Sequence, residues 1–141
     1  MKVIIAEKPS VAQQIAAVVG ATARKGGYIE GGGYAVTWAF GHLVGPAMPE
    51  AYGIEGFKRE NLPILPETFV LEPRRVKSGK EYKPDPGAVK QLAVLKELFF
   101  RAERIVVATD AGREGELIFR TVYCLAGCQK PRARKRTATR T

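Results

Sequence analysis

Acidic residues follow two short apolar runs that are typical of buried strands. Glu7 comes directly after residues 2–6, and Asp110 comes shortly after residues 104–108; both runs are rich in β-branched residues. Glu114 lies four positions after Asp110, beyond a turn that contains glycine. Ligands of open α/β sheets bind at the carboxyl ends of parallel strands. We therefore expect Glu7, Asp110 and Glu114 to converge if the two strands are parallel neighbours.

Carboxylates gathered at one sheet edge suit a divalent cation. Mg²⁺ prefers oxygen ligands, keeps several waters, and is usually held by one or two carboxylates together with a substrate phosphate. Lys8 and Arg113 are adjacent to the acids in sequence and are suited to neutralise them or to bind a phosphate. The pattern indicates phosphoryl transfer on a polyanion. In the alternative interpretation, Asp110 caps the following helix and Glu114 favours its first turn, and the acids alone do not decide between the two.

Strand, loop and helix units must hold these residues at both ends of the chain. The first unit continues from residues 2–6 into a helix that we expect Ser10 to cap and Gly20 to end. The last unit joins residues 104–108 to a helix that begins at Arg113. Alternating strands and helices predict an α/β fold with a mainly parallel central sheet flanked by helices.

The middle of the chain predicts a hairpin, a long loop and one more helix. The hairpin turns at three consecutive glycines, which no Lys-Ser/Thr pair follows, so no nucleotide cofactor is expected. Asp85 is the expected cap of the helix. The predicted segments are the hairpin 28–40, the loop 41–66, a strand 68–71, an exposed, mobile polar segment 74–83 and the helix to about residue 100.

The long loop carries three residues with possible functional roles. His42 is the only histidine, and a packing or hydrogen-bonding role is slightly favoured over catalysis. Lys58 and Arg59 lie beside Phe57, a combination that suits a phosphate backbone with a stacking partner. A solvated surface turn explains this pair about as well.

Length and composition predict one domain, residues 1–129, and a disordered basic tail, residues 130–141. Six lysine and arginine residues and no acid lie in that tail, so only +3 of the net charge of +9 belongs to residues 1–129. No apolar run is long enough to span a bilayer and no signal-peptide pattern begins the chain, which favours the cytosol and no membrane partner. Cys124 and Cys128 have no second pair nearby, so neither zinc nor a disulfide is expected.

Three segments together resemble one known family. Residues 6–12 (Ala-Glu-Lys-Pro-Ser-Val-Ala) and 108–116 (Ala-Thr-Asp-Ala-Gly-Arg-Glu-Gly-Glu) resemble the two signature segments of the Toprim domain in type IA DNA topoisomerases, specifically the bacterial topoisomerase III branch. Residues 37–44 (Thr-Trp-Ala-Phe-Gly-His-Leu-Val), followed by 49–52 and 62–64, are similar to the hairpin end and loop of that branch. The resemblance covers about residues 1–131 in consistent order.

The resemblance implies a Rossmann-like Toprim fold and an isomerase. Such an enzyme cuts one DNA strand through a tyrosyl-phosphate link, passes another strand through the gap and reseals it, with Mg²⁺ as the cofactor. The implied partners are single-stranded DNA and the remaining topoisomerase domains, and the implied location is the bacterial cytoplasm, in association with the nucleoid.

The resemblance also implies residue roles by position. Glu7 would handle a proton on a ribose oxygen and help to hold metal, and Lys8 would stabilise charge on the scissile phosphate. Asp110 and Glu114 would be the first and last acids of the family's Asp-x-Asp-x-Glu metal motif. Arg113 is a further catalytic candidate. The candidate nucleic-acid contacts are Lys8, Lys58, Arg59 and His42.

Two departures from the family pattern limit the expected activity. Gly112 replaces the middle acid of the metal motif, so metal should bind more weakly, although the same Asp-Ala-Gly-Arg-Glu variant recurs in this branch. Residues 132–141 replace the family's continuation, and none of the five tyrosines lies in a matching context. We expect a fragment or truncated reading frame that cannot cleave or relax DNA alone.

Two other functions remain open at this point. The chain could be a non-catalytic Toprim-type module that binds nucleic acid or protein, which Gly112 and the lack of a matching tyrosine favour. Primases and some nucleases share the Toprim scaffold, but the Gly-His-Leu segment and the hairpin that contains Trp38 argue against them.

Overall fold

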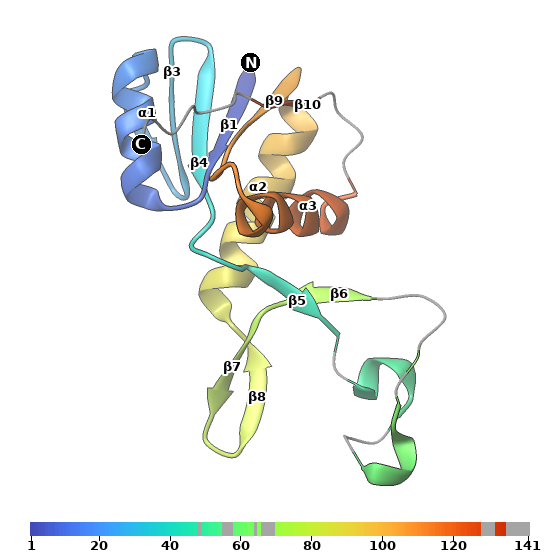
Figure 1. The fold of residues 1–141 in the computed structure, drawn as a ribbon. Coiled ribbons are helices and arrows are strands. Elements are labelled where there is room, and N and C mark those ends of the chain that lie inside the picture. Colours follow the sequence, from blue (N-terminus) through green and yellow to red (C-terminus); the bar gives the residue numbers. More distant parts are fainter. Residues whose placement is uncertain (48, 55–57, 64, 66–69, 128–131, 135–141) are drawn as a thin grey trace.

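The computed structural model describes residues 1–141 except 48, 55–57, 64, 66–69, 128–131 and 135–141 (Figure 1). A sheet of six strands, in the order β10-β9-β1-β4-β3-β2, forms its centre. The first four of these strands are parallel, and β3 and β2 are antiparallel additions. The strands are β1 (Lys2–Ala6), β2 (Ala23–Lys25), β3 (Tyr28–Gly31), β4 (Tyr34–Trp38), β9 (Arg104–Ala108) and β10 (Arg132–Arg134).

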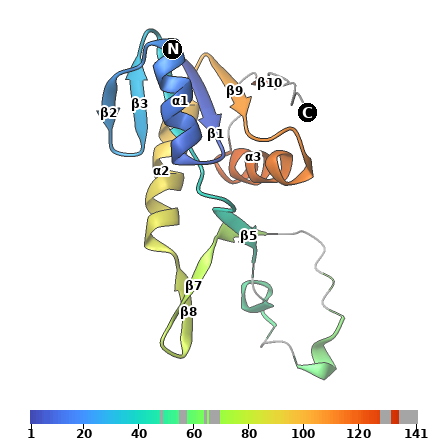
Figure 2. The same cartoon turned by 60° about the vertical axis from the view of Figure 1, so that its left-hand side comes forward.

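Helices cover the two faces of this sheet. Helix α1 (Pro9–Val19) packs on one face, where Ile4 and Val36 meet its small residues Ala12 and Ala16. Helices α2 (Pro86–Arg101) and α3 (Arg113–Leu125) cover the other face, as Figures 1 and 2 show from two sides. Alternate residues of β1 therefore enter different cores, as the two-residue period of a strand requires.

The larger core lies under α2 and α3. Phe99 of α2 and Phe119 of α3 are fully buried there, with ring centroids 6.4 Å apart. Both helices reach the sheet through Val3, Ile105 and their neighbours. This packing fixes the start of α3 against the carboxyl end of β9, where the acidic residues lie.

A long excursion leaves the carboxyl edge of the sheet between β4 and α2. It begins with β5 (Val44–Pro46), which pairs with β6 (Leu71–Pro73), and continues into a hairpin of β7 (Arg75–Ser78) and β8 (Glu81–Pro84). Between β5 and β6 lie two 3₁₀ helices, η1 (Pro49–Tyr52) and η2 (Arg59–Asn61). Figures 1 and 2 agree that the β7–β8 hairpin projects away from the sheet.

The α/β fold with a mainly parallel sheet, predicted from the sequence, is confirmed. Helix α1 starts at Pro9 with Lys8 at the N-cap position, so the predicted cap at Ser10 is wrong. Proline is well suited to the first turn of a helix, because its missing N–H needs no partner there. The predicted stop at Gly20 is confirmed, with a φ of 77°.

Two further segments differ from the expectation. Residues 74–83 were expected to be exposed and mobile; the strands at 75–78 and 81–84 are indeed exposed, but they pair as the β7–β8 hairpin. Residues 132–134, expected to belong to a disordered tail, pair with β9 as edge strand β10, because backbone hydrogen bonding to an open sheet edge does not depend on apolar side chains. The start of the predicted strand 68–71 lies outside the described residues. Within the described part of the chain, no helix has the length and apolar character to cross a membrane.

Candidate metal and phosphate site

Glu7 and Asp110 meet at the carboxyl edge of the sheet. Strands β1 and β9 are parallel neighbours in a register that places Ala6 beside Ala108, so the chain emerges from both strands at the same level. The backbone N–H of Asp110 donates to Oε2 of Glu7 over 3.4 Å. Two carboxylates that are 103 positions apart in sequence are thus brought into one site.

The surroundings of the Glu7 carboxyl raise its pKa. Partial burial raises its pKa above the ordinary value of 4.5, and a hydrogen bond with the Asp110 side chain and the negative charge of Asp110 raise it further. The backbone N–H of Asp110 and the positive charge of Lys8 act in the opposite direction. Two carboxyl groups this close favour a shared proton or a bound cation. The pair therefore has the electrostatics of an incomplete cation site.

Lys8 lies beside this pair at the start of α1. It occupies the N-cap position in extended conformation, its side chain is exposed, and its charge acts on Glu7. The amino-terminal end of a helix carries partial positive charge and free backbone N–H groups. Lys8 and the first turn of α1 together make a cationic border to the carboxylates.

The turn between β9 and α3 is tightly packed against Asp110. A Cβ on Gly115 would lie 2.9 Å from the backbone N and C of Asp110, so only glycine lets α3 approach this closely. Gly112 takes the N-cap position of α3. Because glycine has no side chain, no side-chain hydrogen bond caps the helix at this position. Asp110 therefore precedes the helix and does not cap it. The alternative interpretation of the sequence, in which Asp110 caps this helix, is wrong on this point.

Glu114 is turned toward His42 in this structure. The Nε2 atom of His42 and Oε2 of Glu114 are 2.6 Å apart, a short hydrogen bond between side chains that are 45% and 75% exposed. His42 follows β4, the strand on the other side of β1 from β9. The pair thus links the loop after β4 to the first turn of α3.

The three predicted metal ligands are accordingly not drawn into one cluster. Within the described residues, no group of three or more His, Cys, Asp or Glu side chains is placed to hold a metal ion. The donor chemistry of Glu7 and Asp110 still fits Mg²⁺, which needs only one or two carboxylates when waters and phosphate oxygens complete its shell. The described geometry supports a two-carboxylate site with Glu114 held nearby by His42.

The remaining candidates are more scattered. Arg113 is the first residue of α3 and has an exposed side chain. Lys58 and Arg59 lie at η2, far along the excursion from the carboxyl edge of the sheet (Figure 1, green). These two residues are exposed, and the structure does not bring them to the carboxylates.

Two residues near the site were missed by sequence reasoning. Nε of Arg74 donates to Oδ2 of Asp85 over 2.7 Å, and Nη1 of Arg74 donates to the carbonyl oxygen of Phe40 over 3.2 Å, which fixes the segment before His42. Thr109, at the end of β9, is only 2% exposed, and its hydroxyl has no hydrogen-bond partner among the described residues. An isolated arginine or threonine has no sequence spacing that would have signalled either role.

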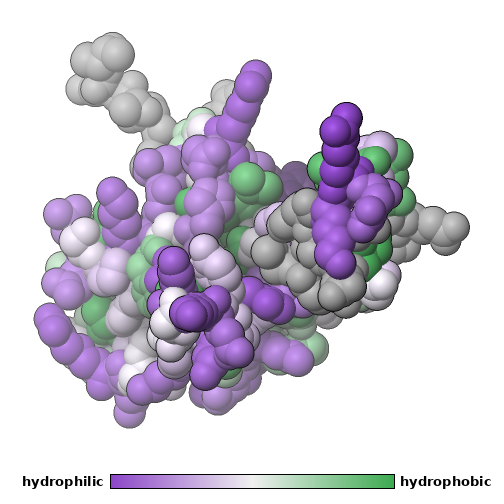
Figure 3. Space-filling model, turned by 90° about the horizontal axis from the view of Figure 1, so that it is seen from below, coloured by the Kyte–Doolittle hydropathy of each residue, from purple (hydrophilic) through white to green (hydrophobic). Residues whose placement is uncertain are grey.

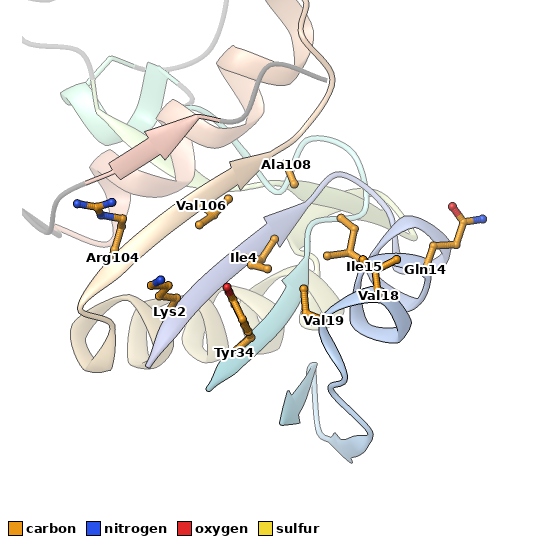
Figure 4. Close-up of a pocket in the computed structure, with 10 residues that line it drawn as sticks. All are labelled: Lys2, Ile4, Gln14, Ile15, Val18, Val19, Tyr34, Arg104, Val106 and Ala108. Atoms are coloured by element: carbon orange, nitrogen blue, oxygen red, sulfur yellow. The ribbon is translucent and has the colours of Figure 1, made fainter. Parts of the chain in front are cut away.

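A separate groove of about 540 Å³ lies on the α1 face of the sheet (Figure 4). It is lined mainly by apolar side chains such as Ile4, Val18 and Val106, with Lys2 and Arg104 at one end. None of the acidic residues that the structure describes lines it. Its chemistry is that of an apolar surface, which does not suit a metal ion.

Comparison with known proteins gives a consistent result. Residues 2–139 match the family model of the Toprim domain. The chain is 44% identical over 131 residues to DNA topoisomerase 3 of Bacillus subtilis (strain 168), and 43% identical over 134 residues to DNA topoisomerase 3 of Shouchella clausii (strain KSM-K16). Each of these matches covers 92% of this chain and 17% of the relative, so the chain spans about one sixth of the length of these relatives.

Proposed function

Because this chain belongs to the Toprim domain family, we propose that it supplies the metal-binding and phosphate-handling part of a type IA DNA topoisomerase. The observation that carries the proposal is the meeting of Glu7 and Asp110 at the carboxyl edge of the sheet, bordered by Lys8. Both signature segments come together at this point, on adjacent strands of the fold. The proposed substrate is single-stranded DNA in the cytoplasm of a bacterium, in association with the nucleoid.

Mg²⁺ is the proposed cofactor, and Glu7 and Asp110 are its proposed ligands. Glu114 lies in the first turn of α3 and would add a third carboxylate oxygen if it left His42. When bound, Mg²⁺ supplies positive charge that compensates the carboxylates and pairs with phosphate oxygens of the DNA strand. Gly112 leaves this set one carboxylate short, so we expect a single, weakly held ion.

The protein groups have separate proposed roles in strand cutting and resealing. Glu7 is the group proposed to exchange a proton with a ribose oxygen, because burial and the neighbouring Asp110 raise the pKa of its carboxyl above the ordinary value. The ammonium group of Lys8 stabilises negative charge on the scissile phosphate. The guanidinium of Arg113 is a second donor for the same phosphate, and Lys58, Arg59 and His42 are proposed contacts to the DNA strand.

The proposal can be tested by exchange of domains. The part of this chain that aligns with Bacillus subtilis DNA topoisomerase 3, at 44% identity over 131 residues, would replace the corresponding part of that enzyme. We expect the chimera to relax negatively supercoiled DNA in the presence of Mg²⁺, and the Glu7→Gln chimera to be inactive. A chimera that is monomeric and folded by circular dichroism, yet inactive beside an active parent enzyme, would overturn the proposal.

A second candidate function is a metal-free binding module. It is favoured by one observation: the described residues contain no ready-made group of three metal ligands, since Glu114 is paired with His42. The chimera also distinguishes this candidate, because a module without chemistry would not support relaxation.

A further inference from the structure

The β7–β8 hairpin carries a cationic and aromatic face that the proposed function does not use. Its turn is formed by Gly79 and Lys80, and only Gly79 has a positive φ, at 65°, which is the pattern of a type II′ turn. Such turns match the twist of the flanking strands and fix the pairing of the hairpin. The register places Arg75 opposite Pro84 and Lys77 opposite Tyr82.

This register determines which side chains share a face. Residues two apart along a strand, and residues directly opposite one another, project to the same side of a two-stranded sheet. Arg75, Lys77 and Tyr82 are therefore on one face, while Glu81 is on the other. Tyr82 is 59% exposed, a large exposed fraction for an aromatic residue. We call Arg75, Lys77 and Tyr82 the hairpin face.

The charge on the hairpin is strongly positive. Residues 74–84 contain five arginine and lysine residues and one acid, Glu81. Arg75 is ion-paired with Glu72 at 3.1 Å, but Lys77 has no ion-pair partner among the described residues. Figure 3 views the molecule from the side on which the hairpin projects and shows a largely hydrophilic surface. A single aromatic ring among cations fits a nucleic-acid strand better than a membrane, which requires a larger apolar area.

The base of the hairpin is fixed to the segment that leads to the acidic site. The N–H of Arg74 donates to the carbonyl oxygen of Leu43, and the N–H of Asp85 donates to the carbonyl oxygen of Arg74, each over 2.8 Å. The Arg74 guanidinium lies over the Phe40 ring, 5.1 Å from its centroid. Phe40 and Leu43 flank His42, which is bonded to Glu114. The hairpin is thus anchored directly beside the carboxyl edge of the sheet.

We propose that the hairpin face binds single-stranded nucleic acid, with one base stacked on Tyr82 and the neighbouring phosphates paired with Lys77 and Arg75. Stacking on an exposed ring and ion pairing with the backbone are the two interactions by which proteins hold single strands without reading sequence. This inference rests on the proposed function, because it takes the same polymer as ligand. In this proposal, part of the nucleic acid lies outside the acidic site, along the β7–β8 hairpin, whose base is fixed to residues 40–43.

The test is fluorescence anisotropy of a labelled oligothymidylate of about 12 nucleotides with the 141-residue chain. The measurement is made in EDTA over a range of salt concentrations, so it does not depend on the metal site. Tyr82→Ala should weaken binding about tenfold without changing the salt dependence, and Tyr82→Phe should restore it. Lys77→Ala should reduce the slope of log affinity against log salt by about 0.7, the loss of one phosphate contact with a single strand.

Matched controls use exposed residues away from the hairpin. Lys25→Ala removes a cation from β2 at the sheet edge, and Phe100→Ala removes a ring that is 52% exposed on α2; neither should change binding. Hairpin variants that bind like the parent chain would overturn this inference alone. If heparin displaced the labelled oligonucleotide as well as unlabelled oligonucleotide does, and Tyr82→Ala had no effect on binding, the inference would also be overturned. No binding by the parent chain would overturn both this inference and the proposed DNA contacts of this domain, while the metal proposal would stand on its own test.

Discussion

Gly112 is the residue at which one more carboxylate would most strengthen the acidic site. Its backbone is extended, with φ −121° and ψ −179°, and a Cβ at this position would meet no atom within 4 Å. Gly112→Asp therefore fits without strain, and aspartate is also a favourable N-cap residue. We expect this variant to bind Mg²⁺ about tenfold more tightly than the parent chain, because it adds a charged oxygen ligand.

Isothermal titration calorimetry would measure that affinity, with Gly112→Asn as a control of similar size but no charge. If Gly112→Asp and Gly112→Asn bound Mg²⁺ equally, position 112 would not contribute to the site.

Residue types at strand ends allowed Glu7 and Asp110 to be predicted as a pair, because parallel neighbours end at a common edge. The partner of Glu114 could not be predicted in the same way. His42 and Glu114 are 72 positions apart, and their contact depends on how the loop after β4 meets α3. The spacing of four between Asp110 and Glu114 was also uninformative, because Asp110 precedes the helix and the two do not share a helix face.

At the scale of elements, the contact between β9 and α3 depends on Gly115. A methyl group there would collide with the backbone of Asp110. We expect Gly115→Ala to lower the free energy of unfolding by about 1–3 kcal/mol, the usual cost of overpacking, and to displace Asp110. Urea denaturation would measure the loss, and Gly45→Ala is the control, because a Cβ on Gly45 meets nothing within 4 Å. Equal stability of the two variants would show that α3 moves away at little cost.

The Arg74–Asp85 pair should make the junction of the hairpin and α2 sensitive to acid. The hydrogen bond from Arg74 holds the pKa of Asp85 below its ordinary value of 3.8. A depressed pKa in the folded state contributes stability above the unfolded value, and this contribution is lost as the pH falls through the folded value. The parent chain should therefore lose more stability than Asp85→Asn when the pH is lowered from about 5 to about 2.

Urea denaturation at each pH would measure this difference. Glu81→Gln, a change on the exposed hairpin, should follow the parent chain. Parallel curves for the parent chain and Asp85→Asn would exclude an acid-sensitive pair.

Elements with a strong local signal were predictable, and those held by tertiary contacts were not. Asp85 caps α2 through Gly87 and Pro86 opens the helix, as the sequence indicated. The β7–β8 hairpin was missed because its strands are exposed on both sides and so lack the alternation of apolar and polar residues that marks a half-buried strand. The edge strand β10 was missed because its basic residues resemble a solvated tail.

At the scale of the whole molecule, the 141-residue chain should lack topoisomerase activity when purified alone. It corresponds to about one sixth of the length of the DNA topoisomerase 3 relatives, and none of its five tyrosines has a sequence context that matches a nucleophile. A supercoil-relaxation assay with Mg²⁺ would test this, with the Bacillus subtilis enzyme as the positive control. Relaxation by the chain that is lost in Glu7→Gln would contradict the expectation.

The order of the strands was the part of the architecture that the sequence left conditional. The acids converge only if β1 and β9 are neighbours, and the structure shows that they are, with β4 on the other side of β1. Both strands are apolar enough to be central, and the helices that precede β4 and β9 in the chain, α1 and α2, lie on opposite faces of the sheet. The strand pairs of the excursion between β4 and α2 could not be expected from the sequence, because β5 and β6 are only three residues long and are held by their mutual pairing and by Val44 and Leu71 against the larger core.

The central claim is that Glu7 and Asp110 form a cation site, and titration of the chain with Mg²⁺ by isothermal titration calorimetry tests it most directly. The parent chain and the control Glu81→Gln should bind Mg²⁺ in the millimolar range or more tightly. Glu7→Gln and Asp110→Asn should weaken binding by at least about tenfold, because each removes a charged ligand. No binding by the parent chain at millimolar Mg²⁺, or equal binding by all four proteins, would contradict the claim.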